Sequence, residues 1–277
     1  MTGARRWQHG LRMLAITALL AAAAFPLYWM LVTSLTPSAK LFAAFPHLLP
    51  DPGEFSVYAD IFRNIPVATW LVNSAVVATG TMAASIALAV FPAYALSRFR
   101  FRGQGLLGFA LFATQMLPEA MLVVPLYAIF ADLALLDSLA GLILANTAFT
   151  VPVITWILKG AIDTVPTEIE EAARIDGCSR IDVVLAVVIP LVKPTLAASG
   201  VIAFFHGWNE YVFAQTLVSS QGLRTASVGL AGFVGELSTP VHSVMAVGII
   251  YTLPAVIFYL FVQRHVVAGL TAGSVKG

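Results

Sequence analysis

The sequence has little charge and almost no cysteine. Only 10% of its 277 residues are charged, whereas a soluble domain carries roughly 25%. With 59% hydrophobic residues, the chain cannot cover a globule with a hydrated surface, and the bilayer is its expected solvent. Its single cysteine, Cys178, excludes an intrachain disulfide and a cysteine-rich metal site. The net charge of +1 gives no general attraction to nucleic acid or to anionic substrates.

The sequence also lacks the motifs of an enzyme. It has no G-x-x-x-x-G-K-[ST] phosphate-binding loop, no pair of catalytic carboxylates, no histidine cluster and no nucleophile elbow. We therefore expect no catalytic residue, no bound cofactor and no metal in this chain. His206 is expected to be packed or hydrogen-bonded rather than a metal ligand, because no second histidine lies at ligand spacing.

What the sequence does contain is long apolar runs, and a helix of about 20 apolar residues crosses the hydrocarbon core. These runs predict an all-α membrane protein with six transmembrane helices in one domain, residues 1–277. The predicted spans are residues 13–35, 68–96, 105–131, 139–158, 191–217 and 243–262. The first span is too long for a signal-peptide core and is expected to be retained. Prolines inside such helices are tolerable, because neighbouring helices or water can satisfy the freed carbonyls. They lie at positions 92, 118, 125, 152 and 254.

Basic residues are distributed unevenly between the segments that join these spans. When the segments are numbered alternately inside and outside from the N-terminus, the inside set holds 12 Lys and Arg residues and the outside set holds three. The positive-inside rule therefore predicts a multi-pass plasma-membrane protein with both termini in the cytoplasm. The long loop between the fourth and fifth spans, residues 160–190, falls on the cytoplasmic side.

The stretch from Lys159 to Lys193 is the most polar part of the chain and carries ten charged residues. A membrane protein that keeps so much charge in one loop is expected to contact something in water with it. The alternative is an amphipathic helix that lies on the membrane surface. Such a helix normally has basic residues and large apolar anchors, whereas this stretch is acidic and rich in alanine. Its composition favours a protein partner.

Capping signals predict two short helices in this loop. Thr167 and Glu170 have the spacing of a capping box that begins a helix. Gly177 can adopt the left-handed conformation that ends one. Ser179 is expected to cap a second helical run, which stops at Pro190. Two helices joined by such a turn present a small, rigid surface.

Part of this loop carries a family resemblance. Glu171-Ala172-Ala173, three residues, Gly177, nine residues and then VVIP at 187–190 resembles the EAA loop of binding-protein-dependent ABC importer permeases. The spacing matches throughout, although valine and isoleucine stand where the family usually has isoleucine and leucine. Other blocks resemble the MalG-type subunit of carbohydrate importers. They are Asn73-Ser74, AYALSR at 93–98, FRG at 101–103, WNEY at 208–211 and AGLTAGSVKG at 268–277.

The resemblance implies the type I ABC importer permease fold, with cytoplasmic coupling helices between spans 4 and 5. It implies a heterodimer with a second permease, two cytoplasmic ATPase subunits that bind ATP and Mg, and an extracytoplasmic solute-binding protein. The chain would be a non-catalytic subunit that forms half of the translocation pathway and couples ATPase closure to alternating access. The residues expected to couple it to the ATPase are Glu170, Glu171, Ala172, Ala173, Asp176, Gly177 and Pro190.

Polar residues inside the predicted spans are candidates for the solute path, because ionisable groups in a membrane are functional hypotheses by default. Glu119 and Gln115 lie in the third span, where the alternative is a carboxylate paired with a neighbouring helix. Asn209 and Glu210 lie late in the fifth span between two aromatic residues, where the alternative is an interfacial aromatic belt. Asn73 is expected to form an interhelical hydrogen bond.

The expected cargo is a sugar, or a sugar-like solute such as a glycerophosphodiester or an amino sugar. The competing class is an autonomous secondary transporter. It would need ion-coupling residues within the spans, where only Glu119 and Glu210 are available, and it leaves the acidic loop unexplained. The tail after Arg264 is expected to be disordered, or, as the resemblance implies, to reach the ATPases or pack beneath the bundle.

Overall fold

The computed structural model describes residues 3–41, 45, 48–51, 55–235 and 240–272, and every regular element within them is a helix. Contacts along the chain divide it into two compact units. One comprises Met1–Val67 with Leu230–Leu253, and the other comprises Ala68–Gly229 with Pro254–Gly277. The expectation of a single transmembrane domain stays a prediction.

Four described helices are long and apolar enough to cross a membrane, and the number rises to six if each of two bent helix pairs is one span. The four are α1 (Gly3–Ser34), α3 (Val67–Arg98), α6 (Leu139–Asp163) and α13 (Val241–Ala272). The first bent pair is α4 (Gln104–Thr114) with α5 (Glu119–Asp132), and the second is Arg180–Leu191 with α10 (Lys193–Asn209). Six spans is therefore the upper count.

The third predicted span is not one helix, because α4 and α5 meet at 100°. Pro118, the N-cap of α5, has an extended backbone with φ −61° and ψ 126°. A proline has no N–H to continue a helix and disfavours helical backbone at the residue before it. The expectation that Pro118 is tolerated inside a helix was therefore wrong, whereas Pro92 and Pro152 do lie inside α3 and α6.

The fifth predicted span is also divided. Its main part is α10, and α11 (Val212–Leu217) is a separate short helix. The helical run before α10 consists of α8 (Arg180–Asp182), the π-helix η3 (Val183–Val188) and α9 (Ile189–Leu191). This run passes through Pro190, so the predicted stop there was wrong. The bend of 84° comes just after it, where Pro194 cannot donate to the Pro190 carbonyl.

In the unit formed by Met1–Val67 and Leu230–Leu253, α1 leads into the 3₁₀ turn η1 (Ser38–Lys40) and then α2 (Ser56–Asn64). The hydroxyls of Ser34 and Tyr58 lie 2.7 Å apart. Ser38 Oγ lies 2.8 Å from His242 Nδ1, near the start of α13. Most described side chains of α1 before its last turns are exposed, so its apolar surface is suited to lipid or to a partner helix.

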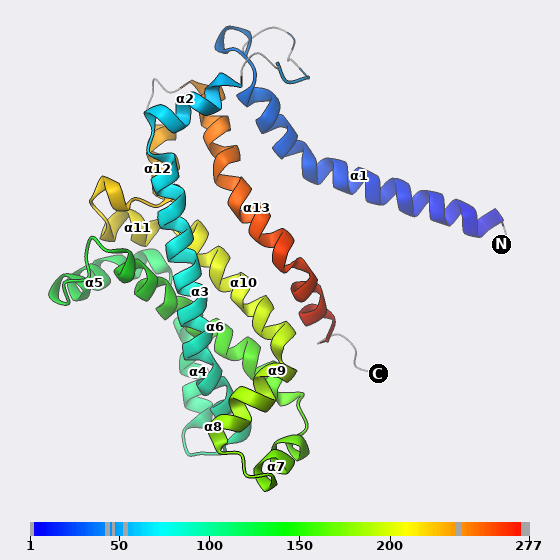
Figure 1. The fold of residues 1–277 in the computed structure, drawn as a ribbon, viewed down its shortest axis with the longest axis vertical. Helices are drawn as coiled ribbons and strands as arrows, with labels where there is room; N and C mark the ends of the chain where they lie inside the picture. Colours follow the sequence, from blue (N-terminus) through cyan, green and yellow to red (C-terminus); the bar gives the residue numbers. More distant parts are fainter. Residues whose placement is uncertain (1–2, 42–44, 46–47, 52–54, 236–239, 273–277) are drawn as a thin grey trace. The chain divides into compact units, whose positions relative to one another are not determined.

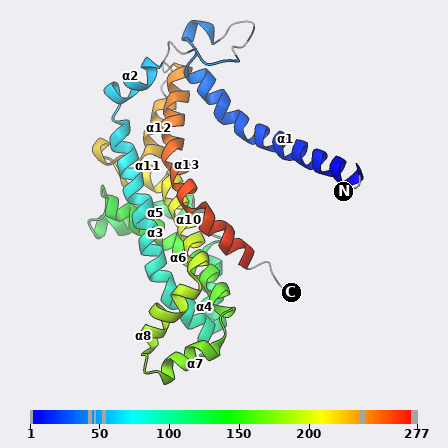
Figure 2. The same ribbon diagram turned by 45° about the vertical axis from the view of Figure 1, so that its right-hand side comes forward.

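In the unit formed by Ala68–Gly229 and Pro254–Gly277, α3, α6 and α10 run side by side (Figures 1 and 2). Small residues let these helices approach closely, as is common in membranes. A methyl group added at Gly207 of α10 would lie only 3.0 Å from the Cα atom of Ala78 in α3. Within this unit, α7 (Thr167–Ile175) lies at the end of the bundle where α3 ends (Figure 1).

The remaining described elements follow α11. They are the 3₁₀ turn η4 (Gln221–Leu223) and α12 (Ala226–Gly235). The tail that was expected after Arg264 begins later, because α13 continues to Ala272. Its last five residues, 273–277, lie outside the described residues.

Candidate functional site

The charged loop folds into two short helices, α7 and α8, joined by a tight turn. Gly177 in this turn has φ +96°, a left-handed conformation that glycine adopts without the steric penalty of a Cβ atom. The amide of Cys178 donates to the Ala173 carbonyl at 3.1 Å and closes the turn. The predicted left-handed conformation at Gly177 is confirmed.

The two helices begin in different ways. At α8, Ser179 Oγ accepts from the Asp182 amide at 3.2 Å, and the Asp182 carboxylate accepts from the Ser179 amide at 3.0 Å. This reciprocal capping box confirms the expected cap at Ser179. The capping box predicted at Thr167 and Glu170 was wrong, because Pro166 is the N-cap of α7 and makes no side-chain cap.

Glu170 does not cap α7 because its carboxylate is bound by α3. Its Oε1 atom accepts from Arg98 Nε at 2.7 Å, and its Oε2 atom accepts from the Tyr94 hydroxyl at 2.8 Å. The side chains of Arg98 and Glu170 are only 11% and 8% exposed. Tyr94 and Arg98 are four residues apart on α3, so they share one face of the helix and reach the same carboxylate. Glu170 is thus an anchor of α7.

Arg98 also holds the end of α6. Its Nη2 atom donates to the carbonyl of Ile162 at 2.8 Å and to the carbonyl of Val165 at 2.7 Å. The last carbonyls of a helix have no partner within its regular ladder. Here the Ile162 carbonyl accepts from the Val165 amide at 3.0 Å as well as from the guanidinium, and the guanidinium also binds the Val165 carbonyl just beyond the end of α6. One side chain therefore joins α3, α6 and α7.

More exposed polar contacts surround this buried pair. The carboxylate of Asp163 accepts from Ser97 Oγ at 2.6 Å and from Lys159 Nζ at 2.7 Å. The guanidinium of Arg180 lies over the ring of Phe99, 5.1 Å from its centroid. Exposed ion pairs contribute little to stability, so these contacts orient the segment more than they hold it.

Apolar side chains attach the same segment to the helix bundle. Val183, Val184 and Val188 of η3 are at most 3% exposed. They belong to one buried cluster with residues of α3 and α6, among them Ala93 and Leu158. Burial of apolar surface stabilises this contact without giving it a direction.

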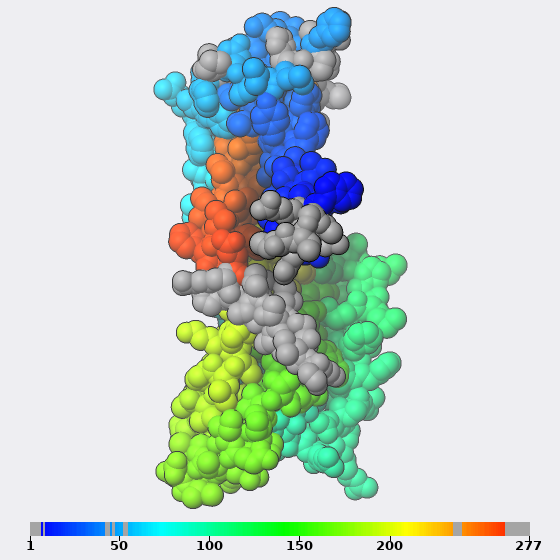
Figure 3. Space-filling view, turned by 90° about the vertical axis from the view of Figure 1, so that its right-hand side faces the viewer, coloured from blue at the N-terminus to red at the C-terminus, as the bar shows by residue number. Residues whose placement is uncertain are grey.

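The opposite face of the two-helix turn is open. Its exposed residues are Glu171, Ala172, Asp176 and Gly177. Ala173 is half-buried and packs against the apolar cluster on the bundle side of the turn. Ile175 beside them is 87% exposed. Figure 3 shows the yellow-green surface of this segment uncovered at the lower end of the view. The adjacent residues Glu170 and Glu171 therefore have different surroundings, since Glu170 is buried in the bundle and Glu171 is exposed.

Glu119 is the first residue of α5 and directly follows the break after α4. Its Oε1 atom lies 3.9 Å from Nε2 of His206 on α10, and its side chain is 40% exposed. The carboxylate thus lies near a neighbouring helix but beyond hydrogen-bond distance of His206. Its pairing with that helix and its contact with the solute both stay predictions. Gln115, before the break, donates its amide to the Phe149 carbonyl of α6 at 3.2 Å.

Glu210 lies between α10 and α11 and caps the second of them. Its carboxylate accepts from the amides of Phe213 at 2.6 Å and Ala214 at 2.9 Å. Glu210 is only 8% exposed, so it does not form part of an exposed aromatic belt. Its neighbour Asn209 is exposed and donates to the Phe205 carbonyl one turn earlier at 3.0 Å.

Asn73, near the start of α3, binds a loop rather than another helix. Its Nδ2 atom donates to the carbonyls of Gly222 and Arg224, each at 2.9 Å. The adjacent Ser74 Oγ accepts from the Ala226 amide at 2.8 Å. These two residues fix the loop that includes η4. Asn73 was expected to bond to another transmembrane helix, and this prediction was wrong about the partner.

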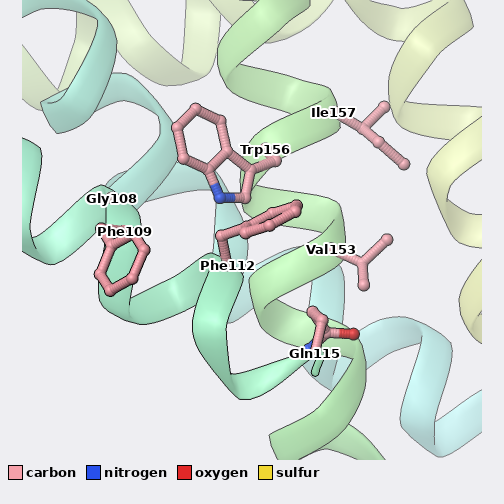
Figure 4. Close-up of a pocket in the computed structure, with 7 residues that line it drawn as sticks. All are labelled: Gly108, Phe109, Phe112, Gln115, Val153, Trp156 and Ile157. Atoms are coloured by element: carbon pink, nitrogen blue, oxygen red, sulfur yellow. The ribbon is translucent and has the colours of Figure 1, made fainter. Parts of the chain in front are cut away.

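An apolar groove of about 610 Å³ lies between α4 and α6 (Figure 4). Its lining residues are Gly108, Phe109, Phe112, Gln115, Val153, Trp156 and Ile157. No charged side chain is among them, and only Gln115 and the indole of Trp156 are polar. Sites that bind polar ligands need several convergent polar groups. The groove is therefore suited to apolar chains or helices rather than to a sugar.

Two features of the site were not expected from the sequence. The roles of Tyr94 and Arg98 went unassigned, although a tyrosine and an arginine one turn apart at the end of an apolar helix are a usable signal. The approach of His206 to Glu119 has no local sequence signal. Within the described part of the chain, no group of three His, Cys, Asp or Glu side chains could hold a metal ion.

Together the fold and the site define a multi-pass helical membrane protein that carries an anchored, outward-facing two-helix turn. The chain belongs to the family described as "Binding-protein-dependent transport system inner membrane component", whose model matches residues 85–272. Members of this family are non-catalytic permease subunits of ABC importers and work with an ATPase and a solute-binding protein. The chain is accordingly such a permease and not an enzyme.

Individual relatives cover nearly the whole chain. The sulfoquinovosyl glycerol transport system permease protein SmoH of Agrobacterium fabrum is 35% identical over 267 residues, which is 96% of this chain and 94% of the relative. The trehalose transport system permease protein SugB of Mycobacterium tuberculosis is 32% identical over 263 residues, which is 94% and 95% of the two chains.

A solved structure shares the fold. One chain in the crystal structure of a bacterial ABC transporter involved in the import of the acidic polysaccharide alginate matches with a TM-score of 0.82. The match covers 96% of this chain and 99% of the other, at 23% identity. The likeness establishes the ABC importer permease fold.

Proposed function

We propose that this chain is the permease subunit of an ATP-driven importer of a sugar or a sugar-like solute. The relatives SmoH and SugB are named for a glycerol glycoside and for a disaccharide, which supports this class of cargo. The observation that carries the coupling role is the anchored α7–α8 turn, exposed on its outer face, in a chain with no phosphate-binding loop. ATP and Mg are then bound by two partner ATPase subunits.

In this proposal the α7–α8 turn and both termini lie in the cytoplasm. The excess of basic residues in the segments assigned to that side supports this orientation. A second, homologous permease completes the pathway, and α7 and α8 are the coupling helices of this half. The apolar groove between α4 and α6 and the exposed surface of α1 offer apolar contact to lipid or to that second permease.

The outer face of the turn enters a groove of the ATPase. Ala172 and Gly177 are small and exposed and let two backbones approach closely, and the exposed Ile175 supplies apolar area. Ala173 supports this face from the bundle side, where it packs against the apolar cluster. Glu171 and Asp176 rim this surface with charge. A carboxylate there can accept charge-assisted hydrogen bonds, which are roughly twice as strong as neutral ones. Glu170 and Pro190 act from outside this face, the first as the anchor of α7 and the second at the start of α9.

Glu119 is the strongest candidate for a contact with the solute. It is a half-exposed carboxylate at the break between two helices of the bundle, with His206 beside it and Gln115 one turn before it. Asn209, which is exposed on α10, is the second candidate. Glu210 supports the path indirectly, because its carboxylate is used to cap α11.

The test is to purify the complex through a tag on this chain and to measure its ATPase rate in lipid nanodiscs. We expect the ATPase subunits to copurify, and their rate to rise when a binding protein loaded with trehalose or another glycoside is added. Gly177→Pro should abolish the stimulation, because proline cannot adopt φ +96°. The matched control, Gly177→Asn, should retain it, because asparagine tolerates this conformation.

Glu171→Ala tests the docking face in the same assay, with Asp60→Ala, at an exposed carboxylate on α2, as its control. We expect only the first to weaken the stimulation. Solute uptake by the purified chain without any ATPase would overturn the proposal and would support an autonomous secondary transporter instead.

A further inference from the structure

The buried contact behind the docking face joins three helices through two side chains. We propose that Arg98 and Glu170, assisted by Tyr94, are the positioning residues that transmit movement of α7 to the membrane helices α3 and α6. This inference rests on the proposed function, because it presupposes that an ATPase moves α7. It assigns the transmission to named atoms at the ends of α3 and α6.

The geometry makes α7 and α3 move as one body. Both carboxylate oxygens of Glu170 are held by α3, one by Arg98 Nε at 2.7 Å and one by the Tyr94 hydroxyl at 2.8 Å. A carboxylate held at both oxygens by two donors one turn apart cannot rotate or slide without losing a hydrogen bond. A displacement of α7 is therefore passed to the last turn of α3.

The same guanidinium also binds the end of α6 and so connects α6 to α3 and α7. Arg98 Nη2 donates to the carbonyls of Ile162 and Val165, which lie at and just beyond the end of α6. The planar, forked guanidinium fixes the direction of each of these bonds. An ammonium group in its place would keep the charge beside Glu170 but could not satisfy both carbonyls with the same geometry.

Burial makes this link stiffer than the other contacts of the segment. Arg98 and Glu170 are 11% and 8% exposed, so separating them would leave unpaired charges in an environment that does not solvate them. The valine contacts of η3 lack direction and permit small sliding movements. The Lys159–Asp163 pair, at 24% and 43% exposure, is open to water and carries little energy. Energetic coupling between distant sites requires elements that shift as units, and the buried pair supplies the connection here.

The experiment uses the complete complex in proteoliposomes and measures solute taken up per ATP hydrolysed, together with the amount of assembled complex. Arg98→Lys preserves the positive charge beside Glu170 but removes the guanidinium that donates to the two carbonyls at the end of α6. We expect normal amounts of complex and a ratio that falls about tenfold, in the range of typical coupling energies. Lys159→Ala is the matched control on the exposed pair and should leave the ratio unchanged. An unchanged ratio in Arg98→Lys would overturn the proposal.

A double variant separates transmission from simple stability. Arg98→Met with Glu170→Leu removes both charges, a replacement that often preserves or improves stability at a buried ion pair. We expect this complex to assemble in normal amounts but to take up much less solute per ATP hydrolysed than the wild type. If the double variant assembles and transports as much solute per ATP as the wild type, the pair is only structural and the inference is wrong. If it does not assemble, Arg98→Lys decides the question alone.

The wild-type complex distinguishes this inference from the proposed function. Failure of the wild type to couple ATP hydrolysis to uptake would contradict the proposed function itself. Normal coupling in the wild type, retained in Arg98→Lys, would contradict only the role of the buried pair.

Discussion

The helix α3 holds a loop near each of its ends, and it does so with different chemistry. Near its C-terminal end, Tyr94 and Arg98 bind the carboxylate of Glu170 in a nearly buried ion pair. Near its N-terminal end, Asn73 and Ser74 bind backbone groups of the loop around η4 through neutral hydrogen bonds.

The difference lies in what it costs to disturb each end. Breaking a buried ion pair leaves a charge without a partner, whereas breaking a neutral hydrogen bond costs about 1 kcal/mol plus the desolvation of the group left behind. The charged end is therefore the more rigid connection. It is also the end that, in the proposed function, receives the movement of the ATPase.

The largest effect is expected at the charged end. Glu170→Ala leaves the guanidinium of Arg98 buried without its carboxylate, and we expect a loss of about 3–5 kcal/mol of stability. The measurement is the midpoint of thermal unfolding of the purified chain in detergent.

The matched control for this prediction is Arg98→Met with Glu170→Leu, which removes both charges together. It should lose far less stability than Glu170→Ala. Equal losses in the two variants would show that the unpaired charge is not the main cause of the lost stability. The charged end of α3 would then not differ from the neutral end in the way proposed.

An intermediate effect is expected at the neutral end. Asn73→Ala removes the donor shared by the carbonyls of Gly222 and Arg224, and we expect a loss of about 2 kcal/mol. The exposed Thr79→Ala, whose hydroxyl bonds only within its own helix, is the control and should stay near the wild type. A loss at Asn73 that exceeds the loss at Glu170 would reverse the comparison.

A smaller effect is expected from the hydroxyl of Tyr94. Tyr94→Phe removes one donor to Glu170 while Arg98 keeps its single bond to that carboxylate. We expect a loss of about 1.5 kcal/mol in the free energy of unfolding, seen as a lower midpoint in the same thermal measurement. Tyr127→Phe, at an exposed tyrosine, is the control. No change in Tyr94→Phe would show that Arg98 alone fixes the carboxylate.

The smallest effect is expected at an exposed carboxylate, which separates the role of burial from that of charge. Asp137, between α5 and α6, accepts from the Ser220 hydroxyl and from the amides of Ser220 and Ser219. The Ser220 hydroxyl and amide are the main causes that lower the pKa of this carboxyl. A lowered pKa in the folded state contributes stability above the ordinary carboxyl pKa of about 3.9. That stability is lost as the pH falls through the folded pKa.

Asp137→Asn should therefore lower the unfolding midpoint slightly at pH 7, and the difference from the wild type should disappear as the pH falls below about pH 4. An identical acid response in the variant and the wild type would show that this carboxylate makes no contribution.

The local features of this fold were predictable from the sequence, and the long-range ones were not. The left-handed turn at Gly177 and the cap at Ser179 follow from residue type and spacing within a few positions, and the structure has both. The apolar runs likewise predicted the helices that could cross a membrane, with six as the upper count.

The errors arose where a distant partner competed with a local rule. Glu170 has capping-box spacing from Thr167, but Arg98, 72 positions earlier, binds its carboxylate instead. Asn73 likewise bonds a loop about 150 positions later. Such pairings depend on which helix ends the fold brings together, and no spacing rule within one helix records that. Pro118 stands at the start of α5, after the break that follows α4, whereas Pro92 lies inside α3. Residue type alone did not distinguish the two prolines.

Glu170 is buried in the bundle, and in the proposed function the adjacent Glu171 contacts the ATPase. The accessibility of position 171 to a reagent in water reports this contact. Cys178 is the only cysteine of the chain, so Cys178→Ala provides a background in which Glu171→Cys can be labelled alone with a water-soluble maleimide. Gly222→Cys, in the exposed η4 turn, serves as the control in the same background.

We expect rapid labelling of Glu171→Cys in the chain alone and strong protection once the ATPase subunits are bound, with the Gly222→Cys control labelled equally in both. Equal labelling of Glu171→Cys with and without bound ATPase subunits would contradict the proposed contact.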